Sequence, residues 1–254
     1  MMVQDRPDVR RTALVEGRPV HFRVVRAGSP VVLLHGLSGS SRWWSRNVEA
    51  LSRRLVVYSI DLPSFGDNRR WGKFVLDEAA VNLLGWMDAV GLDKPNVIGH
   101  SMGGWIAADL ACRWPARIDR LVLVDAPRLI DERGNFRLVS AASGAARRLP
   151  LRFLPVLIAD AVRAGPLTLR SAGREMRRAD LGPDLDRITA PTLLIWGEHD
   201  RLLPLAYGRR VAAALGAVLQ VIERAGHNPM WEEPFAFNRI ALDFLTAEHP
   251  DSAQ

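Results

Sequence analysis

Residues 97–105 read VIGHSMGGW, in which a serine stands between two glycines where an apolar run gives way to small residues. The run before it has the apolar character of a buried strand, and the residues from Met102 onward place apolar side chains at helical spacing. The stretch matches the pattern Gly-x-Ser-x-Gly, whose glycines leave space for a very tight turn from strand to helix. Such a turn lifts the hydroxyl of Ser101 clear of the sheet, so Ser101 is predicted to be a nucleophile.

A serine at a strand-to-helix boundary has a simpler interpretation, because serine is a favoured N-terminal capping residue of helices. Capping does not require a glycine on each side of the serine, and for this reason we prefer the nucleophile. A serine hydroxyl attacks a carbonyl carbon only when a base removes its proton and a third group orients that base. The chain should therefore also supply a histidine and an acid.

Two later loops contain the required side chains. Residues 197–200 read GEHD after one strand-like run, and residues 226–229 read GHNP after the next. We predict Asp200 as the acid and His227 as the base, since open α/β sheets build their sites at the carboxyl ends of strands. Asp125 also follows a strand-like run and remains the alternative acid.

The chain alternates between apolar strand-like runs and amphipathic segments of helical period. This alternation predicts an α/β fold with a mostly parallel central sheet, right-handed crossovers and helices on both faces. The segments expected to be helices are 77–91, 102–115, 205–216 and 234–248. The runs expected to be strands are 19–28, 30–36, 55–63, 95–101, 118–127, 191–200 and 217–226.

The alternation stops between residues 128 and 182. That segment has no strand-like run, and it holds eleven arginines against five acidic residues. We expect a helical cap over the carboxyl edge of the sheet, inserted into a core domain made of residues 1–127 and 183–254. Such a cap would shape a binding pocket.

Composition limits the compartment and the partners. The single cysteine, Cys112, cannot form an internal disulfide, and the charged first residues lack the apolar segment of a signal peptide, so a cytoplasmic protein is expected. No run approaches the roughly 20 apolar residues that span a bilayer, so no membrane partner is expected. We expect a monomer or a homodimer.

The net charge of +6 raises the question of nucleic-acid binding. All but two of the 34 basic residues are arginine, a bias that nucleotide composition alone can produce, so no nucleic-acid partner is predicted. The six histidines are dispersed and lack the paired spacing of metal ligands. No metal and no cofactor is predicted.

Five separated motifs resemble those of α/β-hydrolase-fold enzymes, and they occur in the same order along the chain. The resemblance is to the type with a serine nucleophile and a helical cap. The resemblance covers nearly the whole chain and implies that the backbone N–H groups of Leu37 and Met102 form the oxyanion hole. One loop departs from the family pattern, because Ser64 stands where Asp-x-Pro-Gly-x-Gly has its first glycine. The motifs are His35-Gly36, Asp61-Leu62-Pro63, the serine stretch, Gly-x-x-Asp at 197–200 and Gly-His-x-Pro at 226–229.

The resemblance implies a serine hydrolase that works through an acyl-enzyme, with a carboxylesterase for small to medium apolar acyl esters as the leading expectation. The same triad in this family also serves hydrolysis of carbon–carbon bonds in ring-cleavage products, lactonase, thioesterase and perhydrolase reactions, so these remain alternatives. Epoxide hydrolases and haloalkane dehalogenases are disfavoured, because they need an aspartate nucleophile where this chain has Ser101. A non-catalytic ligand receptor or accessory protein is the alternative from another class.

The expected substrate is a small-molecule ester held in an apolar pocket. His35 and Gly36 belong to the predicted oxyanion loop, and tryptophans flank the site motifs. The residues predicted to line the substrate pocket are His35, Gly36, Trp43, Trp44 and Trp231.

Overall fold

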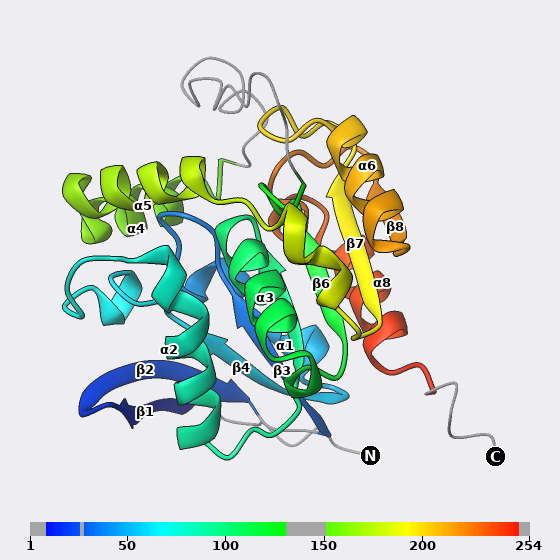
Figure 1. Cartoon of the computed structure of the whole chain (residues 1–254). Helices are drawn as coiled ribbons and strands as arrows, with labels where there is room; N and C mark the ends of the chain where they lie inside the picture. Colours follow the sequence, from blue (N-terminus) through cyan, green and yellow to red (C-terminus); the bar gives the residue numbers. More distant parts are fainter. Residues whose placement is uncertain (1–8, 26–27, 131–150, 249–254) are drawn as a thin grey trace.

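A mixed sheet of eight strands forms the centre of the structure, a computed structural model that describes residues 9–25, 28–130 and 151–248 (Figure 1). The strand order is β1-β2-β4-β3-β5-β6-β7-β8. β2 pairs antiparallel with β1 and with β4, and the pairs from β4 through β8 are parallel. The strands are β1 (Val9–Val15), β2 (Arg18–Val25), β3 (Ser29–Leu34), β4 (Leu55–Ile60), β5 (Asn96–His100), β6 (Leu121–Val124), β7 (Thr192–Gly197) and β8 (Val218–Ile222).

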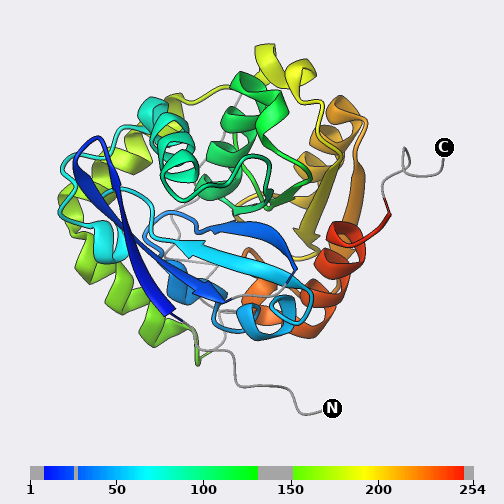
Figure 2. The ribbon, with the colours of Figure 1, turned by 90° about the horizontal axis from the view of Figure 1, so that it is seen from below.

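Continuous apolar strands arise because both faces of the sheet are covered. In β3, Val32 and Leu34 pack into one core, whereas Val31 and Leu33 pack into the core on the opposite face. Successive side chains of a strand point to opposite faces, so a strand buried on both sides has to be apolar throughout. Helices α2, α3 and α6 cover the first face and α1 and α8 the second (Figure 2). These helices are α1 (Val48–Leu51), α2 (Leu76–Ala89), α3 (Met102–Arg113), α6 (Leu205–Leu215) and α8 (Pro234–Leu245).

Strand β1 was not among the strands expected from the sequence. Residues 9–15 pair along their whole length with β2 through a tight turn at Glu16 and Gly17, both of which have positive φ. The strand lies at the edge of the sheet and is mostly exposed, so its sequence carries arginines instead of a continuous apolar run. Because most of its side chains are exposed, the hydrophobic pattern did not predict this strand.

The chain between β6 and β7 contains the described part of the expected cap. Residues 131–150 of that expected insertion lie outside the described residues, and the division into core and cap stays a prediction. Helices α4 (Leu154–Ala164) and α5 (Pro166–Arg178) pack against each other, α4 near the short 3-10 helix η2 (Gly66–Asn68) and α5 against α2. Within the described residues, none of the helices combines the length and apolar character that crossing a membrane requires.

Candidate active site

Ser101 occupies the turn between β5 and α3 in a conformation that non-glycine residues rarely adopt. Its φ is 51° and its ψ −118°, outside the regions that L-residues ordinarily populate. A Cβ on Gly99 would lie 2.4 Å from the carbonyl oxygen of Gly103, so the turn closes only because glycine is present there. The Ser101 hydroxyl makes no capping hydrogen bond to α3, which removes the capping interpretation. Backbone strain of this kind clusters at functional sites.

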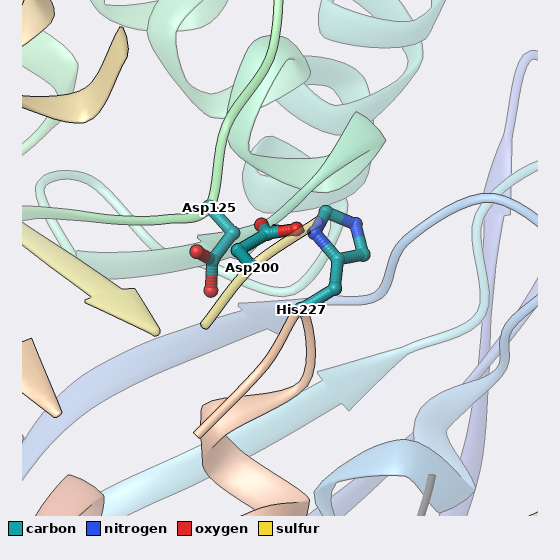
Figure 3. Close-up of side chains that lie close together, drawn as sticks. All are labelled: Asp125, Asp200 and His227. Carbon is teal, nitrogen blue, oxygen red and sulfur yellow. Dashed lines mark hydrogen bonds and ion pairs between the residues drawn. The ribbon is translucent and has the colours of Figure 1, made fainter. Parts of the chain in front are cut away.

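The three predicted catalytic side chains form a continuous hydrogen-bonded line. Nε2 of His227 lies 3.1 Å from Oγ of Ser101, and Nδ1 of the same ring lies 2.7 Å from Oδ2 of Asp200. Asp200 follows β7 and His227 follows β8, so neighbouring parallel strands bring the two side chains to the same edge of the sheet. Figure 3 shows the carboxyl group of Asp200 facing the imidazole ring of His227.

Hydrogen bonds hold Asp200 as an anion. Its Oδ1 accepts the backbone N–H groups of Leu202 and Leu203 at 2.7 and 2.9 Å. Burial opposes ionisation of this carboxyl, but attraction to His227 and the hydrogen bonds from His227 and Leu203 outweigh burial and hold its pKa below the ordinary value. An anionic Asp200 keeps the proton of His227 on Nδ1, which leaves Nε2 free to accept the proton of Ser101.

Two residues that the sequence did not single out as functional hold the His227 loop. The carboxylate of Glu232 accepts the N–H of Gly226 at 2.6 Å and that of Asn228 at 3.0 Å, so it grips the backbone on both sides of His227. Nε2 of His100 donates to the carbonyl oxygen of His227 at 2.7 Å. Burial and the charge of His227 lower the pKa of His100 to about 3, which keeps its ring neutral.

The loop after β3 carries the predicted oxyanion residues. His35 is fully buried; its Nδ1 donates to the carbonyl of Gly36 at 2.8 Å, and its Nε2 accepts the N–H of Leu62 at 3.0 Å. Burial lowers the pKa of His35, so this ring is a neutral brace and not a base. A Cβ on Gly36 would lie 3.2 Å from Cβ of Ser101, which shows how closely the loop passes the serine.

Met102 is the first residue of α3, where backbone N–H groups have no partner within the helix. Leu37 follows Gly36 in the loop that passes the serine. Stabilisation of an oxyanion by the N–H groups of Leu37 and Met102 stays a prediction.

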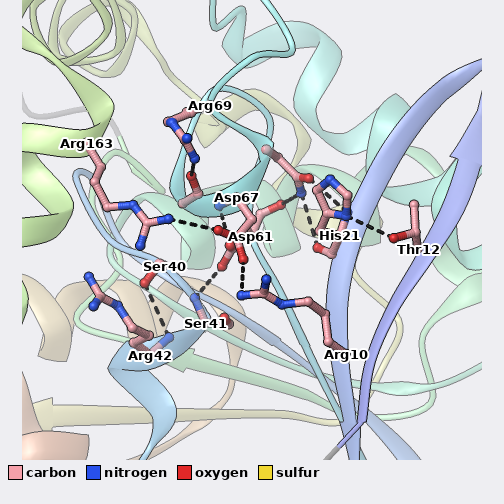
Figure 4. A network of polar contacts seen from close by, with 12 residues as sticks. Arg10, Thr12, His21, Ser40, Ser41, Arg42, Asp61, Asp67, Arg69 and Arg163 are labelled. Carbon is pink, nitrogen blue, oxygen red and sulfur yellow. Dashed lines mark hydrogen bonds and ion pairs between the residues drawn. The ribbon is translucent and has the colours of Figure 1, made fainter.

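The loop after β4 is braced by backbone hydrogen bonds to Asp61 (Figure 4). The Asp61 carboxylate accepts the N–H of Ser41 at 2.6 Å and that of Asp67 at 2.7 Å, which ties this loop to the one after β3. Ser64, at the family's glycine position, adopts a φ of 71°, and its hydroxyl donates to the carbonyl of Gly72 at 2.7 Å. The departure from the family pattern therefore leaves a positive φ in place and adds a hydrogen bond.

Helix α4 is joined to the loop after β3 by a buried carboxyl group. Asp160, only 1% exposed, accepts a hydrogen bond from Oγ of Ser40 at 2.8 Å and forms an ion pair with Arg42. A second ion pair, 2.9 Å long, joins Arg163 of the same helix to Asp67 (Figure 4). These polar contacts fix α4 over the loops that follow β3 and β4.

Aromatic side chains connect the chain just before α4 to the site. Phe153, just before α4, packs between Trp43 and Trp231 with ring centroids 5.2 and 4.6 Å apart. Trp43 in turn lies 5.7 Å from the ring of His100, next to the serine. The ring contact of Trp44 is with Phe237 of α8, and Trp44 is fully buried. The predicted role of these tryptophans in lining a substrate pocket stays a prediction.

Asp125, Asp200 and His227 are also the group within the described residues whose ligand-type atoms converge, all within 4.8 Å of one another. The same atoms of Asp200 and His227 already serve the hydrogen bond between the two residues. Within this cluster, the contact that orients the imidazole ring is the one between Asp200 and His227.

Comparison with known proteins agrees with this geometry. The model of the alpha/beta hydrolase family matches residues 31–240. This chain belongs to the alpha/beta hydrolase family. The matched region covers the loop after β3, the strained serine, the acid and the histidine.

Two curated relatives are named as hydrolases of unsaturated 2-hydroxy-6-oxo acids. The chain is 30% identical to 2-hydroxy-6-oxo-6-phenylhexa-2,4-dienoate hydrolase of Burkholderia cepacia, with 89% of this chain and 91% of the relative covered. It is 31% identical to 2-hydroxy-6-oxononadienedioate/2-hydroxy-6-oxononatrienedioate hydrolase 1 of Pseudomonas putida, with 89% and 92% covered. Among solved structures, the enol-lactonase of Burkholderia xenovorans matches with a TM-score of 0.76 and 26% identity, covering 93% of this chain and 100% of that one.

Proposed function

We propose that this alpha/beta hydrolase cleaves carboxylic esters with small to medium apolar acyl groups through an acyl-enzyme on Ser101. The observation that carries the proposal is the line from Asp200 through His227 to Ser101, with contacts of 2.7 and 3.1 Å. In that line the serine has a base within reach and the base has an orienting anion, which are the requirements for nucleophilic acyl transfer.

The chemistry follows from the positions of these atoms. Nε2 of His227 takes the proton of Ser101 while Oγ attacks the carbonyl carbon of the ester, and Asp200 stabilises the imidazolium that forms. The N–H groups of Leu37 and Met102 would donate to the tetrahedral oxyanion. His227 then gives its proton to the leaving alcohol, and a water molecule, activated by the same ring, releases the acid from Ser101.

The surroundings of the triad favour an apolar substrate. Trp43, Phe153 and Trp231 form a stacked aromatic group between the cap and the loops at the site. Each of the three side chains is at most 5% exposed, so the group forms a closely packed apolar layer beside the site. Aromatic walls with few polar groups are typical of sites for apolar small molecules.

A second candidate is hydrolysis of a carbon–carbon bond next to a ketone. The curated relatives at 30 and 31% identity support it, because both are named as hydrolases of hydroxy-oxo-dienoate compounds. The same serine attack on a ketone would produce an acyl-enzyme, with a carbon leaving group that takes its proton from His227. The match to an enol-lactonase supports attack on an ester-type carbonyl.

One experiment separates these functions. Wild-type protein and the Ser101→Ala variant are assayed with p-nitrophenyl esters of two to eight acyl carbons, with 2-hydroxy-6-oxo-6-phenylhexa-2,4-dienoate, and with a fluorophosphonate probe. We expect the wild type to be labelled and to turn over the shorter esters, and the variant to do neither. Turnover of the dienoate at a higher kcat/KM than any ester would assign the second candidate. Labelling without turnover would favour a ligand receptor, and absence of labelling would contradict an activated serine.

A further inference from the structure

A second buried carboxyl lies beside the triad. Asp125 follows β6 directly, has a φ of 43° and is fully buried. Its Oδ1 accepts the N–H of Gly197 at 3.1 Å. Its Oδ2 is buried, and no N–H or O–H group in the described part of the chain donates to it. Figure 3 shows the carboxyl of Asp200 between Asp125 and the ring of His227. The triad mechanism makes no use of Asp125.

Two carboxylates cannot both stay charged in this position. Ligand-type oxygens of Asp125 and Asp200 and a nitrogen of His227 lie within 4.8 Å of one another. Like charges at this distance in a buried site force one of the two carboxyls to keep its proton. Glu232, which accepts backbone N–H groups on both sides of His227, is a third acid here, and its charge also opposes ionisation of Asp125.

The hydrogen bonds decide which carboxyl holds the proton. Asp200 accepts two backbone N–H groups and faces His227, all of which favour its anion. Asp125 accepts a single N–H group. Burial and the charge of Asp200 raise the pKa of Asp125 well above its ordinary value, in agreement with that asymmetry.

We propose that Asp125 is a positioning residue whose protonated carboxyl donates a hydrogen bond from Oδ2 to the carboxylate of Asp200. A carboxylate has about four acceptor positions, and three of those of Asp200 are used by Leu202, Leu203 and His227, so one is open for this donor. The additional bond fixes the plane of the Asp200 carboxylate against Nδ1 of His227. Its consequence for catalysis rests on the proposed function, whereas the protonation of Asp125 does not.

The first test is thermodynamic and needs no substrate. Unfolded Asp125 is ionised at neutral pH, but folded Asp125 holds a proton, so the contribution of Asp125 to stability is largest at low pH and is lost as pH rises. Relative to Asp125→Asn, the unfolding equilibrium constant of the wild type should therefore rise about tenfold per pH unit between about pH 5 and 7. Urea unfolding at several pH values measures this ratio. Asp93→Asn, at a fully exposed carboxylate, is the matched control for losing a carboxyl. A ratio that stays constant with pH would overturn the proposal.

Infrared difference spectra observe the proton itself. The spectrum of the wild type minus that of Asp125→Asn at pH 7 should contain the carbonyl stretch of a protonated carboxylic acid. A difference spectrum with carboxylate bands instead would contradict a neutral Asp125. Neither the unfolding test nor the infrared test uses turnover. The protonation of Asp125 can therefore be refuted separately from the proposed ester hydrolysis.

The pH profile of Ser101 labelling tests the positioning role. An amide at position 125 still donates a hydrogen bond and carries no charge, so the acid limb of the fluorophosphonate labelling rate should stay within a few tenths of a pH unit in Asp125→Asn. Asp125→Ala removes the donor and makes Asp200 more basic, which should move the acid limb to higher pH. If Asp125 were ionised, Asp125→Asn would remove a negative charge near His227 and move the limb to lower pH. That shift would refute the proposal.

Discussion

Replacing Asp200 by asparagine tests which carboxyl orients the catalytic histidine. In Asp200→Asn the amide oxygen can still accept the N–H groups of Leu202 and Leu203, which the wild-type Oδ1 accepts at 2.7 and 2.9 Å. The amide nitrogen then faces Nδ1 of His227 in place of the oxygen that lies 2.7 Å from it. An N–H donor in that position moves the imidazole proton from Nδ1 to Nε2. The loop should keep its conformation while the ring adopts the wrong tautomer.

The expected loss follows from that tautomer. With a proton on Nε2, His227 donates to Ser101 across the 3.1 Å contact and no longer accepts from it. In the chymotrypsin triad the same substitution lowers kcat about 10⁴-fold, and we expect a fall of about 10³ to 10⁴ in kcat/KM here, or about 4 to 5.5 kcal/mol of transition-state stabilisation. Initial rates on p-nitrophenyl butyrate, with unfolding by urea as a check on the fold, measure it.

Asp125→Asn is the matched control, because it makes the same chemical change at the neighbouring carboxyl. We expect it to lose less than about tenfold in kcat/KM, since a neutral donor replaces a neutral donor. If Asp125→Asn cost as much as Asp200→Asn, or more, the acid of the triad would be Asp125 and the assignment drawn from the 2.7 Å contact would be refuted.

Three further predictions concern the surroundings of the triad. Glu232→Gln leaves one backbone N–H beside His227 facing an NH₂ group. Since a hydrogen bond to a charged group contributes about 1.5 to 3 kcal/mol, kcat/KM should fall about 10- to 100-fold. An unchanged rate would show that the His227 loop keeps its conformation without Glu232. Asp160→Ala removes the acceptor of Ser40 and the partner of the partly exposed Arg42, so the free energy of unfolding in urea should fall by about 1 to 3 kcal/mol. A smaller loss would mean that these contacts of α4 contribute little to stability. His100 is neutral when folded and protonated when unfolded below about pH 6.5, so its contribution to stability is lost as the pH falls below that value. Relative to His100→Asn, the folding equilibrium constant of the wild type should drop up to tenfold per pH unit from about 6.5 towards 3, a comparison that cancels the opposite trend of Asp125; parallel curves would contradict a buried neutral ring.

Much of the fold could be predicted from the sequence, because burial determines the local pattern of apolar residues. The parallel strands were recognisable because strands covered on both faces must be apolar along their whole length, as in β3 and β6. The edge strand β1 escaped because only one of its sides has a partner strand and most of its side chains face water. Hydrophobic pattern reports burial, so an exposed element gives little signal.

The three residues of the hydrogen-bonded line could also be predicted from local sequence. Ser101, Asp200 and His227 each stand just after a strand of a parallel sheet, and the carboxyl ends of such strands lie at one edge whatever the length of chain between them. The glycines around Ser101 mark the tight turn directly, because a Cβ in their place would meet backbone at 2.4 to 2.6 Å. These are constraints that short stretches of sequence carry by themselves.

The contacts that tune the site were decided by tertiary structure. Glu232 holds the loop of His227 and Asp160 of α4 accepts a hydrogen bond from Ser40, and neither contact was predicted from the sequence. The sequence offered Asp125 only as an alternative acid, and only the structure places it beside Asp200. The protonation of a carboxyl depends on the charges and burial around it, which exist only after the chain has folded. The sequence by itself thus determined which side chains lie at the carboxyl edge of the sheet. Only the folded structure decided which of two adjacent acids is charged, because that choice depends on distances between residues far apart in the chain.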